Sequence, residues 1–292
     1  MRRSVFLIFI SAMLLIVVFA LLTQSLFIVK RLAKVEGVAG KVMLKRGGMG
    51  DFAPLGKAEF VMTEDTLKTG EDGIAELRWL DGTRLKMAPR TEMTVKKSST
   101  HMVRGNDETE FALTNGTIFV RIMKALSPQS RFEVQTPTAV AAVRGTIFMV
   151  KVEAGKTQVA VHKGSVKVSS GEGSDLHESL IEPGTVASSS SPGDVNSAKD
   201  AAIEAIFAAQ SDIIKPELSA KIMKLQNGEK LLLQGRTEAG NTVTVNGQKV
   251  TLLDNGMFTK RTKSQPGKNE FKIVTTDPHG ETAELTKTIA LP

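Results

Sequence analysis

The stretch TPTAVAAVRGTIFMV, residues 136–150, places one arginine and one glycine between two apolar runs. Both runs are short and contain many valine, alanine and isoleucine residues, which is typical of strands buried in a β-sheet. A charged side chain between such runs needs a partner or a ligand, because burying an unpaired charge is costly. Arg144 therefore has either a structural or a functional role.

Residues 35–186, which surround this stretch, consist of short alternating runs separated by glycine-containing turns, with no helical period. This pattern predicts an all-β domain. Opposed residues of a hairpin must share a face of the sheet, so the apolar pattern tests the register of each turn. We predict two-residue loops at Asn115-Gly116, opposing Leu113 to Ile118, at Gly155-Lys156, opposing Val152 to Val159, and at Lys163-Gly164, opposing Val161 to Val166. The last two loops would make residues 146–169 a three-stranded meander.

The turn at Asp81-Gly82 follows a different rule. A two-residue loop there would place charged residues opposite Leu77 and Trp79. A three-residue loop, Leu80-Asp81-Gly82, instead opposes Leu77 to Leu85. We therefore predict the three-residue loop, with Gly82 in the left-handed region and Trp79 pointing inward.

The composition limits the chemistry that the chain can perform. It has 292 residues, a formal net charge of +7 and no cysteine. The length suits two domains of roughly 100 to 200 residues each. Without cysteine the chain has no disulfide, no thiolate nucleophile and no thiolate metal site. The missing disulfides do not assign a compartment, because domains of this size are stable without them.

An apolar segment near the N-terminus determines the expected compartment. Residues 5–29 are almost entirely apolar. As a helix they would span about 37 Å, which exceeds the roughly 30 Å hydrocarbon core of a bilayer. We expect a single-pass anchor in the inner membrane, with residues 1–4 cytoplasmic and the C-terminal body periplasmic. The alternative is a cleaved signal peptide ending near Ala20, although apolar residues continue past that site.

A linker and a second domain follow the β domain. After residue 187 a serine-rich polar stretch leads into one amphipathic helix, expected from about Ala198 to Ile214, with Ser197 as its cap. We expect this helix to pack on a neighbouring domain rather than on a membrane surface. The predicted domains are a cytoplasmic N-terminus (1–4), a transmembrane anchor (5–29), an all-β domain (35–187), a linker with a helix (188–215) and a β-sandwich (216–292).

The last of these domains is predicted from short strands and frequent turns, which are typical of a small sandwich. Its turns include two Asn-Gly pairs, at which we predict two-residue loops. The first opposes Val243 to Val250 across Asn246-Gly247, and the second opposes Leu253 to Phe258 across Asn255-Gly256. The fold class is thus mainly β, with an N-terminal transmembrane helix and a short linking helix.

Five segments of the all-β domain together resemble the FecR domain, a periplasmic all-β module. They are GVAGKV (37–42), DTLKTG (65–70), AELRWLDGT (75–83), TPTAVAAVRGTIF (136–148) and VHKGSV (161–166). The likeness covers about half of the chain, and the ordered series is more specific than any one motif. Two later segments, TVTVNG (242–247) and NEF (269–271), resemble a bacterial Ig-like domain.

The FecR resemblance implies partners in the cell envelope. The namesake of the family is a transmembrane regulator that carries a signal from an outer-membrane transporter to a cytoplasmic sigma factor. It does so through a cytoplasmic segment ahead of its anchor. Here only Met1 to Ser4 precede the apolar segment, and four residues cannot fold into an element that binds a sigma factor. The resemblance therefore implies the exported module without the complete regulatory circuit.

The resemblance also marks residues whose role we expect to be structural. Arg144 is the best candidate for a functional charge, because the adjacent glycine leaves room for a ligand or a second backbone. We prefer the structural alternative, in which Arg144 bonds a carboxylate or carbonyl groups at a strand bend. The family signature comprises Thr136, Pro137, Arg144, Gly145 and Thr146, and the predicted turn glycines are Gly82, Gly116, Gly164 and Gly247.

No residue pattern points to catalysis, to a metal or to a cofactor. The glycines of residues 47–50 lack the strand, lysine and helix of a phosphate loop. No pair of carboxylates stands out as an acid and a base. The histidines are scattered among turns without metal-ligand spacing, and we expect them to be solvated; they are His101, His162, His177 and His279. We therefore expect that the protein is not an enzyme, and no arrangement of catalytic residues indicates a hydrolase.

The net positive charge of the chain limits the partners that we expect for it. Basic residues recur on predicted outward faces, where interspersed acids indicate solvated surfaces; examples are Arg78, Arg84, Lys86, Lys151 and Lys167. Without clustered bases and stacking aromatic residues, we expect no nucleic acid, and we expect no small-molecule substrate. The preferred hypothesis is a non-enzymatic scaffold that binds envelope proteins through sheet edges and loops, in protein interaction or signalling. The alternative is a module that binds envelope polysaccharide or peptidoglycan through its basic faces.

Overall fold

The structure, a computed structural model, describes residues 13–15, 28–103, 105–123, 129–143, 145–225 and 229–292. The expected anchor at residues 5–29 lies outside the described residues, except for two short pieces. Residues 13–15 are helical, and Ile28 and Val29 belong to a strand. Among the described residues, no helix is both long enough and apolar enough to cross a membrane.

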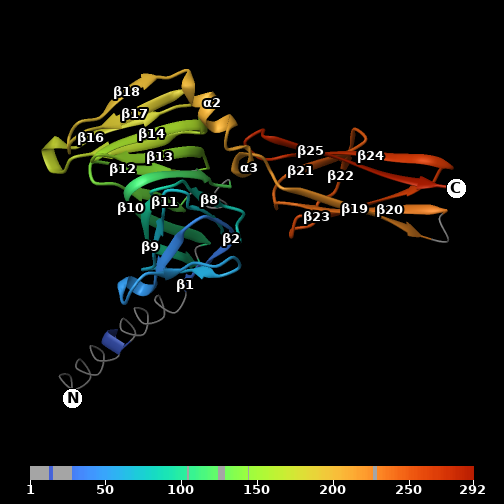
Figure 1. The fold of residues 1–292 in the computed structure, drawn as a ribbon, viewed down its shortest axis with the longest axis horizontal. Helices are drawn as coiled ribbons and strands as arrows, with labels where there is room; N and C mark the ends of the chain where they lie inside the picture. Colours follow the sequence, from blue (N-terminus) through green and yellow to red (C-terminus); the bar gives the residue numbers. More distant parts are fainter. Residues whose placement is uncertain (1–12, 16–27, 104, 124–128, 144, 226–228) are drawn as a thin grey trace, which may run out of the picture.

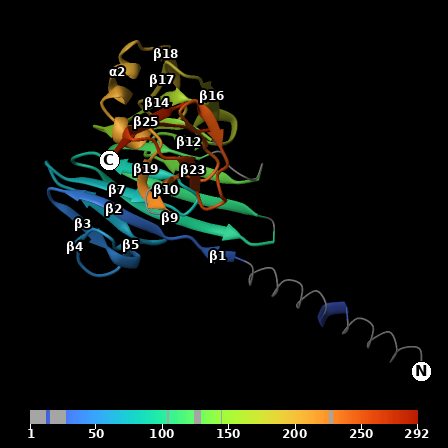
Figure 2. The ribbon, with the colours of Figure 1, turned by 90° about the vertical axis from the view of Figure 1, so that its right-hand side faces the viewer.

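Two β bodies make up the described chain, a barrel and a sandwich that extends from one side of it (Figure 1). The first eighteen strands form the closed barrel. They are β1 (Ile28–Lys30), β2 (Ala33–Ala39), β3 (Val42–Lys45), β4 (Ala53–Pro54), β5 (Phe60–Val61), β6 (Thr66–Thr69), β7 (Ile74–Arg78), β8 (Arg84–Met87), β9 (Glu92–His101), β10 (Asn106–Arg121), β11 (Arg131–Gln135), β12 (Val140–Val143), β13 (Ile147–Glu153), β14 (Lys156–Lys163), β15 (Val166–Ser170), β16 (His177–Ile181), β17 (Thr185–Ser189) and β18 (Asn196–Lys199). Both views place β1 to β5 toward one end of the barrel and β16 to β18 at the other (Figures 1 and 2).

Strand β10 belongs to both sheets of the barrel. Its first part pairs with β9 and β11, and its last part pairs with β8 and β13. The predicted hairpin at Asn115-Gly116 is therefore wrong, because both residues lie inside this single 16-residue strand. Asn115 pairs with Glu92, and Gly116 pairs with Val152. Gly116 has φ +94°, so the glycine permits an irregularity at which the strand passes from one sheet to the other.

The predicted meander over residues 146–169 is also wrong in part. β13 and β14 do pair, but the loop is Ala154-Gly155, and Val159 opposes Val150 instead of Val152. This shift of two residues keeps the same side chains on the same face, so the apolar pattern could not detect it. β14 then pairs with β17, while β15 pairs with β12 and β16. The chain therefore crosses from one sheet to the other at Gly164 and makes no hairpin there.

The predicted three-residue loop at Leu80-Asp81-Gly82 is confirmed. Leu77 opposes Leu85, and the Trp79 amide donates to the Thr83 carbonyl at 2.9 Å. Gly82 has φ +85°. The register places the Trp79 ring inside the barrel, where its side chain is buried.

The core of the barrel is built around a row of aromatic rings. Trp79, Phe111, Phe132 and Phe148 follow one another with ring centroids 5.6, 5.3 and 6.1 Å apart. The indole Nε1 of Trp79 donates to Ser98 Oγ at 3.2 Å, which satisfies the one polar group of this row. Aliphatic side chains from the alternate positions of both sheets fill the remaining space.

Two short helices stand where one longer helix was expected. They are α2 (Ala202–Ala208) and α3 (Ser211–Ile214). Ser188 and Ser189 of the serine-rich stretch belong to β17 and the expected cap Ser197 belongs to β18, so the barrel extends past residue 187. The Ala202 amide, at the start of α2, donates to Asp200 Oδ1 at 2.8 Å.

These helices pack on the barrel, as the amphipathic pattern predicts. Ile203 and Phe207 of α2 and Ile213 and Ile214 of α3 are buried. They form one cluster with barrel residues that include Phe119, whose ring lies 6.1 Å from that of Phe207. The helices are therefore the structural link between the barrel and the second body.

The C-terminal body is a sandwich of two sheets around one apolar core. One sheet has the order β19–β20–β23 and the other β22–β21–β24–β25. The strands are β19 (Leu218–Leu225), β20 (Lys230–Thr237), β21 (Thr242–Val245), β22 (Gln248–Val250), β23 (Met257–Lys263), β24 (Gly267–Thr276) and β25 (Thr282–Leu291). This architecture agrees with the expected sandwich.

The two Asn-Gly turns of the sandwich have different outcomes. The turn at Asn246-Gly247 is confirmed, because Val243 opposes Val250 and both loop residues have positive φ. The register at Asn255-Gly256 is wrong by one residue. The Leu253 amide donates to the Met257 carbonyl at 2.8 Å, so the loop has three residues. Leu253 is consequently exposed on the face opposite to buried Phe258.

Replacing Gly116 tests its place in the shared strand. Gly116→Ala and Gly155→Ala both add a side chain at positive φ, which costs roughly 1 to 2 kcal/mol. Only at residue 116 would the new Cβ also lie 2.3 Å from Thr91 Oγ1 and 2.4 Å from Thr91 Cα, whereas nothing lies within 4 Å at residue 155. We expect urea unfolding to show a clearly larger loss of unfolding free energy for Gly116→Ala. Equal losses would contradict the bend in β10.

Candidate functional site at the junction of the two domains

Three arginines form a row across adjacent strands at the end of the barrel that meets the sandwich. Arg78 of β7 opposes Arg84 of β8, and Arg84 opposes Arg121 of β10. Like charges in directly opposed positions repel one another and destabilise a sheet. The barrel itself supplies Glu36, 3.4 Å from Arg78 Nη1, and the other acids that pair with this row come from outside the barrel.

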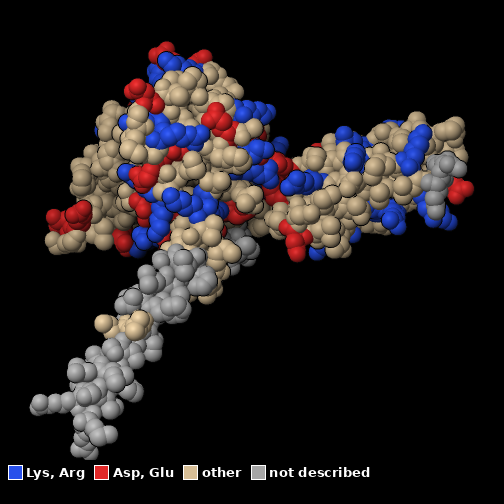
Figure 3. Space-filling view, turned by 90° about the horizontal axis from the view of Figure 1, so that it is seen from below, with Lys and Arg blue, Asp and Glu red and all other residues tan. Residues whose placement is uncertain are grey.

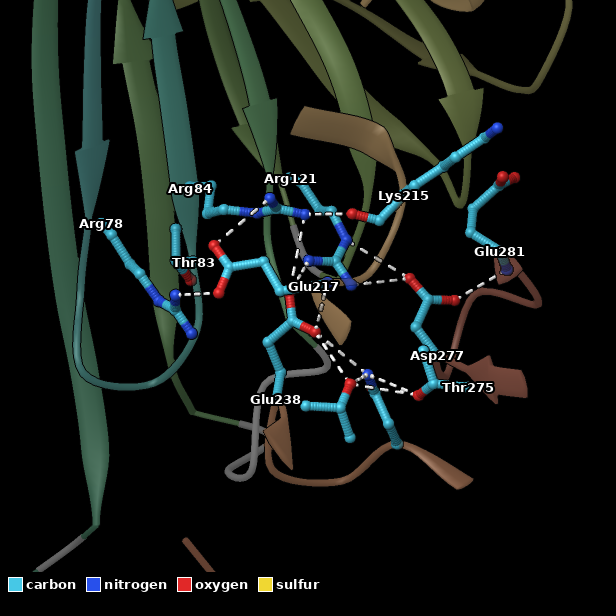
Figure 4. A network of polar contacts seen from close by, with 12 residues as sticks. Arg78, Thr83, Arg84, Arg121, Lys215, Glu217, Glu238, Thr275, Asp277 and Glu281 are labelled. Atoms are coloured by element: carbon cyan, nitrogen blue, oxygen red, sulfur yellow. Dashed lines mark hydrogen bonds and ion pairs between the residues drawn. The ribbon is translucent and has the colours of Figure 1, made fainter. Parts of the chain in front are cut away.

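The sandwich supplies that charge to Arg121, whose side chain is fully buried (Figure 4). Arg121 Nη1 donates to Glu238 Oε1 at 2.8 Å, and Arg121 Nη2 donates to Asp277 Oδ2 at 3.0 Å. Glu238 directly follows β20, and Asp277 directly follows β24. Both acids are also buried, so the pairs lie in a site that water does not screen.

Each of the two carboxylates has further hydrogen bonds that fix its position. Glu238 Oε2 accepts from the Glu217 amide at 2.9 Å and from Asn241 Nδ2 at 3.1 Å. Asp277 Oδ1 accepts from the amides of His279 and Glu281, each at 2.8 Å. Because their lone pairs are satisfied in this way, the acids present one oxygen each to the guanidinium of Arg121.

The pKa of Glu238 reflects the competition between burial and the nearby arginines. Burial alone would raise the pKa of this carboxyl, since it penalises the charged form. The nearby guanidinium groups of Arg121 and Arg84 outweigh burial and hold the pKa of Glu238 below its ordinary value of 4.5. Glu238 therefore favours the charged state in the folded protein.

Arg84 and Arg78 connect the barrel to the segment between the domains. Arg84 Nη1 donates to the Asp212 carbonyl at 3.0 Å, and Arg84 Nη2 donates to the Lys215 carbonyl, so this side chain binds the end of α3. Burial and the adjacent Arg121 lower the pKa of Arg84. Arg78 Nη1 donates to Glu217 Oε2 at 2.5 Å. The expectation that Arg84 lies on a solvated face is therefore wrong, because its side chain is 8% exposed.

Two histidines also lie at this junction. His162 Nε2 is 3.2 Å from Glu281 Oε1, and His162 Nδ1 is 3.4 Å from Glu204 Oε2. Its ring stacks on Phe207 with centroids 5.1 Å apart. His279 Nε2 lies 2.9 Å from the Ile122 carbonyl of the barrel. The expectation of solvated histidines is wrong for His162, whose side chain is 11% exposed.

A cleft of about 780 Å³ opens beside the ion pairs and is lined by both domains. The barrel contributes the Leu80-Asp81-Gly82 turn and Phe132 to its wall. The sandwich contributes residues 236–240 and the turn at residues 254–255. Leu80 is a fully exposed apolar side chain at the rim, which makes it suited to contact a partner.

The predicted signature residues lie beside the junction or in the barrel. Arg144 lies outside the described residues, and Gly145, with φ +58°, lines the cleft. Thr146 is buried in the barrel. Thr136 Oγ1 donates to the Ala139 carbonyl at 2.7 Å in the turn between β11 and β12, where Pro137 is exposed. The structural role expected for the signature residues stays a prediction.

Sequence reasoning did not single out Arg121, the residue at the centre of the junction. The misplaced hairpin at Asn115-Gly116, which opposed Leu113 to Ile118, would have placed Arg121 opposite Glu110 instead of Arg84. The register that opposes Arg84 to Arg121 joins strands far apart in the chain, so only the structure reveals it. Two arginines in opposed positions on one sheet indicate a need for acids from elsewhere.

The fold defines a class of two-domain, all-β proteins in which a barrel and a sandwich are joined by buried ion pairs. Residues 65–167 match the family model described as FecR protein, so the chain carries a FecR domain within its barrel. Residues 226–292 match the model described as glucodextranase, domain B. No curated protein matches the chain.

Two of the solved structures that match the chain show a distant likeness to it. A proposed anti-sigma factor from Parabacteroides distasonis, solved at 1.65 Å, matches with 17% identity and a TM-score of 0.39. The match covers 50% of this chain and 64% of that protein, so the chain spans less than two thirds of its length. A polysaccharide lyase matches with 11% identity and a TM-score of 0.22, over 88% of this chain and 40% of the lyase.

Removing the central arginine tests the junction. Arg121→Met removes the guanidinium partner of buried Asp277 and leaves buried Glu238 with Arg84 Nη2 at 3.6 Å, and breaking a buried ion pair in this way costs about 3 to 5 kcal/mol. Arg90→Met is the matched control, because Arg90 pairs with Glu71 on the surface, where both side chains are largely exposed. We expect urea unfolding to show the large loss for Arg121→Met and a change within about 0.5 kcal/mol for Arg90→Met. Comparable small changes would show that the junction is not held by Arg121.

The lowered pKa of Glu238 predicts sensitivity of the junction to acid. A carboxyl whose pKa is lowered on folding stabilises the fold above its ordinary pKa of 4.5. That stabilisation is lost as the pH falls through the lower value of the folded state. We expect the unfolding free energy of the wild-type protein to fall more steeply below pH 4.5 than that of Glu238→Gln. Parallel pH profiles of the two proteins would contradict this assignment.

Proposed function

We propose that the chain is a membrane-anchored envelope protein that binds a partner protein in the cleft between its barrel and its sandwich. Its role is that of a non-enzymatic scaffold in protein interaction or signalling. The apolar residues 5–29 and the FecR family match support an inner-membrane anchor with a periplasmic body. The single observation that carries the binding proposal is the cleft to which both domains contribute.

The construction of the cleft favours recognition of another protein. Its walls are turns and strand ends held on two β scaffolds, and binding residues are commonly presented on such loops. Apolar side chains such as Leu80, Met123 and Phe132 alternate with charged ones such as Arg31 and Arg236. Apolar contact area surrounded by polar groups is the usual anatomy of a protein interface.

The charged side chains around the cleft are held in place before a partner arrives. Arg31 donates to Asp81 Oδ2 at 2.5 Å, and Asp81 also accepts from the Thr83 amide at 2.9 Å. This contact fixes the Leu80-Asp81-Gly82 turn to Arg31, the residue that directly follows β1. A preorganised surface loses less conformational entropy on binding, so this turn is a suitable contact point.

The chemistry of the described residues supports binding rather than catalysis. Within the described part of the chain, no three His, Cys, Asp or Glu side chains are grouped to hold a metal. The described lining of the cleft includes no histidine, so it offers no imidazole base beside its serine and threonine hydroxyls. We therefore assign the cleft to recognition.

Crosslinking in intact cells tests the proposal. A photo-crosslinking amino acid at position 80 should capture one envelope protein, whereas the same amino acid at exposed position 49, outside the cleft, should not. Ala239→Arg fills the sandwich wall of the cleft and should reduce the adduct at position 80 at least several-fold. Ala290→Arg, at an exposed position of β25, is the matched control and should leave the adduct unchanged. The absence of an adduct above the level at position 49 would overturn the proposal.

A further inference from the structure

The outer face of the three-stranded sheet of the sandwich carries bases and no acids. The buried residues Leu231 and Leu233 of β20 point to the core, so the alternate positions of that strand face outward. Register extends this outer face to the neighbouring strands, since Lys221 opposes Gln234 and Arg261 opposes Leu232. The basic face so defined comprises Lys221, Lys230, Arg236, Arg261 and Lys263.

Acidic residues are missing from all three strands of this sheet, β19, β20 and β23. None of the five bases forms an ion pair with a described residue, although many lysines and arginines elsewhere in the described chain do. All five bases are exposed. Figure 3 shows basic side chains spread along this side of the sandwich, with acidic ones mainly near its two ends.

The other sheet of the same sandwich provides an internal comparison. There Lys268 Nζ lies 2.6 Å from Glu270 Oε2 and Lys272 Nζ lies 2.9 Å from Glu284 Oε1, whereas the exposed Lys249 of β22 forms no ion pair with a described residue. The two faces therefore differ in charge balance while belonging to one small domain. Solubility alone does not account for this difference, since outward residues of the four-stranded sheet are exposed as well.

The basic face also carries a local conflict. Lys230 and Lys263 occupy directly opposed positions of β20 and β23. Two like charges in such positions repel and destabilise the sheet. A bound polyanion would relieve this repulsion, so the conflict is expected at a surface that binds negative charge.

We propose that this basic face binds a linear acidic polysaccharide through its regularly placed carboxylates or other anionic groups. The apolar residues between the bases, such as Met223 and Leu232, are half-buried and offer nothing to insert into a bilayer. The described outer face has no aromatic ring on which nucleic-acid bases could stack. An extended chain of charges without apolar groups is the partner that this surface fits.

The proposal concerns a surface separate from the cleft, and it does not depend on the protein partner proposed there. Arg236 lies at the edge of both surfaces, so it is left unchanged in the test. The variant is the double substitution Lys230→Gln and Lys263→Gln. Its matched control is Lys268→Gln and Lys272→Gln, which removes the same charge from the opposite face of the sandwich.

The experiment measures binding of the full chain in neutral detergent to polygalacturonate, with neutral dextran and vesicles of phosphatidylglycerol as comparison probes. We expect binding to polygalacturonate that weakens as salt rises, and no binding to dextran. The Lys230/Lys263 variant should bind roughly tenfold more weakly, by analogy with the loss of two phosphate contacts on a polyanion. The control should change by less than about twofold, as expected for charges outside a binding surface.

Three outcomes would overturn the proposal: no binding to polygalacturonate at low salt, equal losses in both double variants, or binding to vesicles without binding to the polymer. Thermal unfolding separates loss of binding from loss of folding. The Lys230/Lys263 variant should melt no lower than the wild-type protein, because it removes a like-charge pair. Crosslinking at position 80 should be the same in this variant, so a failure here is distinct from a failure of the cleft proposal.

Discussion

The buried guanidinium of Arg121 is the interaction on which the two-domain structure depends. Register places it beside Arg84 and Arg78 on three neighbouring strands, and a sheet cannot bury such a row without compensating charge. Apart from Glu36 of the barrel, which pairs with Arg78, the acids come from the sandwich and from the segment that leads into it, so the charges of the barrel are fully compensated only when the sandwich is docked. The junction is thus a part of the fold of each domain, in contrast to a loose contact between two independent bodies.

The sequence analysis predicted the local structure correctly where the separation of apolar and charged side chains between the two faces of a hairpin fixes its register. The turns at Gly82 and at Asn246-Gly247 are of this kind, because a slip would have mixed apolar and charged side chains. It failed at Gly116, where the turn-forming dipeptide serves a bend within one long strand. Glycine at positive φ is required by both a hairpin and a bend, so the dipeptide does not distinguish them. Only the later pairing of β10 with β8 and β13, which joins residues far apart in the chain, decides between the two.

The dependence of the fold on contacts between distant parts of the chain also explains which site residues the sequence analysis missed. A charge on a predicted outward face is normally solvated, and Lys151 and Lys167 keep substantial exposure in the structure. Arg84 has the same alternation but is covered by α3 and the sandwich. Burial of that kind depends on how the domains dock, and the alternation of side chains along one strand gives no information about docking. The cleft is equally invisible in the sequence, because its walls come from turns of both domains.

The charge of the chain is consequently divided between two uses. At the junction, buried acids pair with arginines, and these ion pairs hold the domains together. On the outer face of the three-stranded sheet, bases remain unmatched and contribute to the net charge of +7. Because the junction fixes the sandwich relative to the barrel, it also fixes the direction in which the basic face and the cleft point. A partner that engages the cleft would then meet both domains in one defined orientation, and any change of that orientation would have to break buried pairs instead of bending a flexible linker.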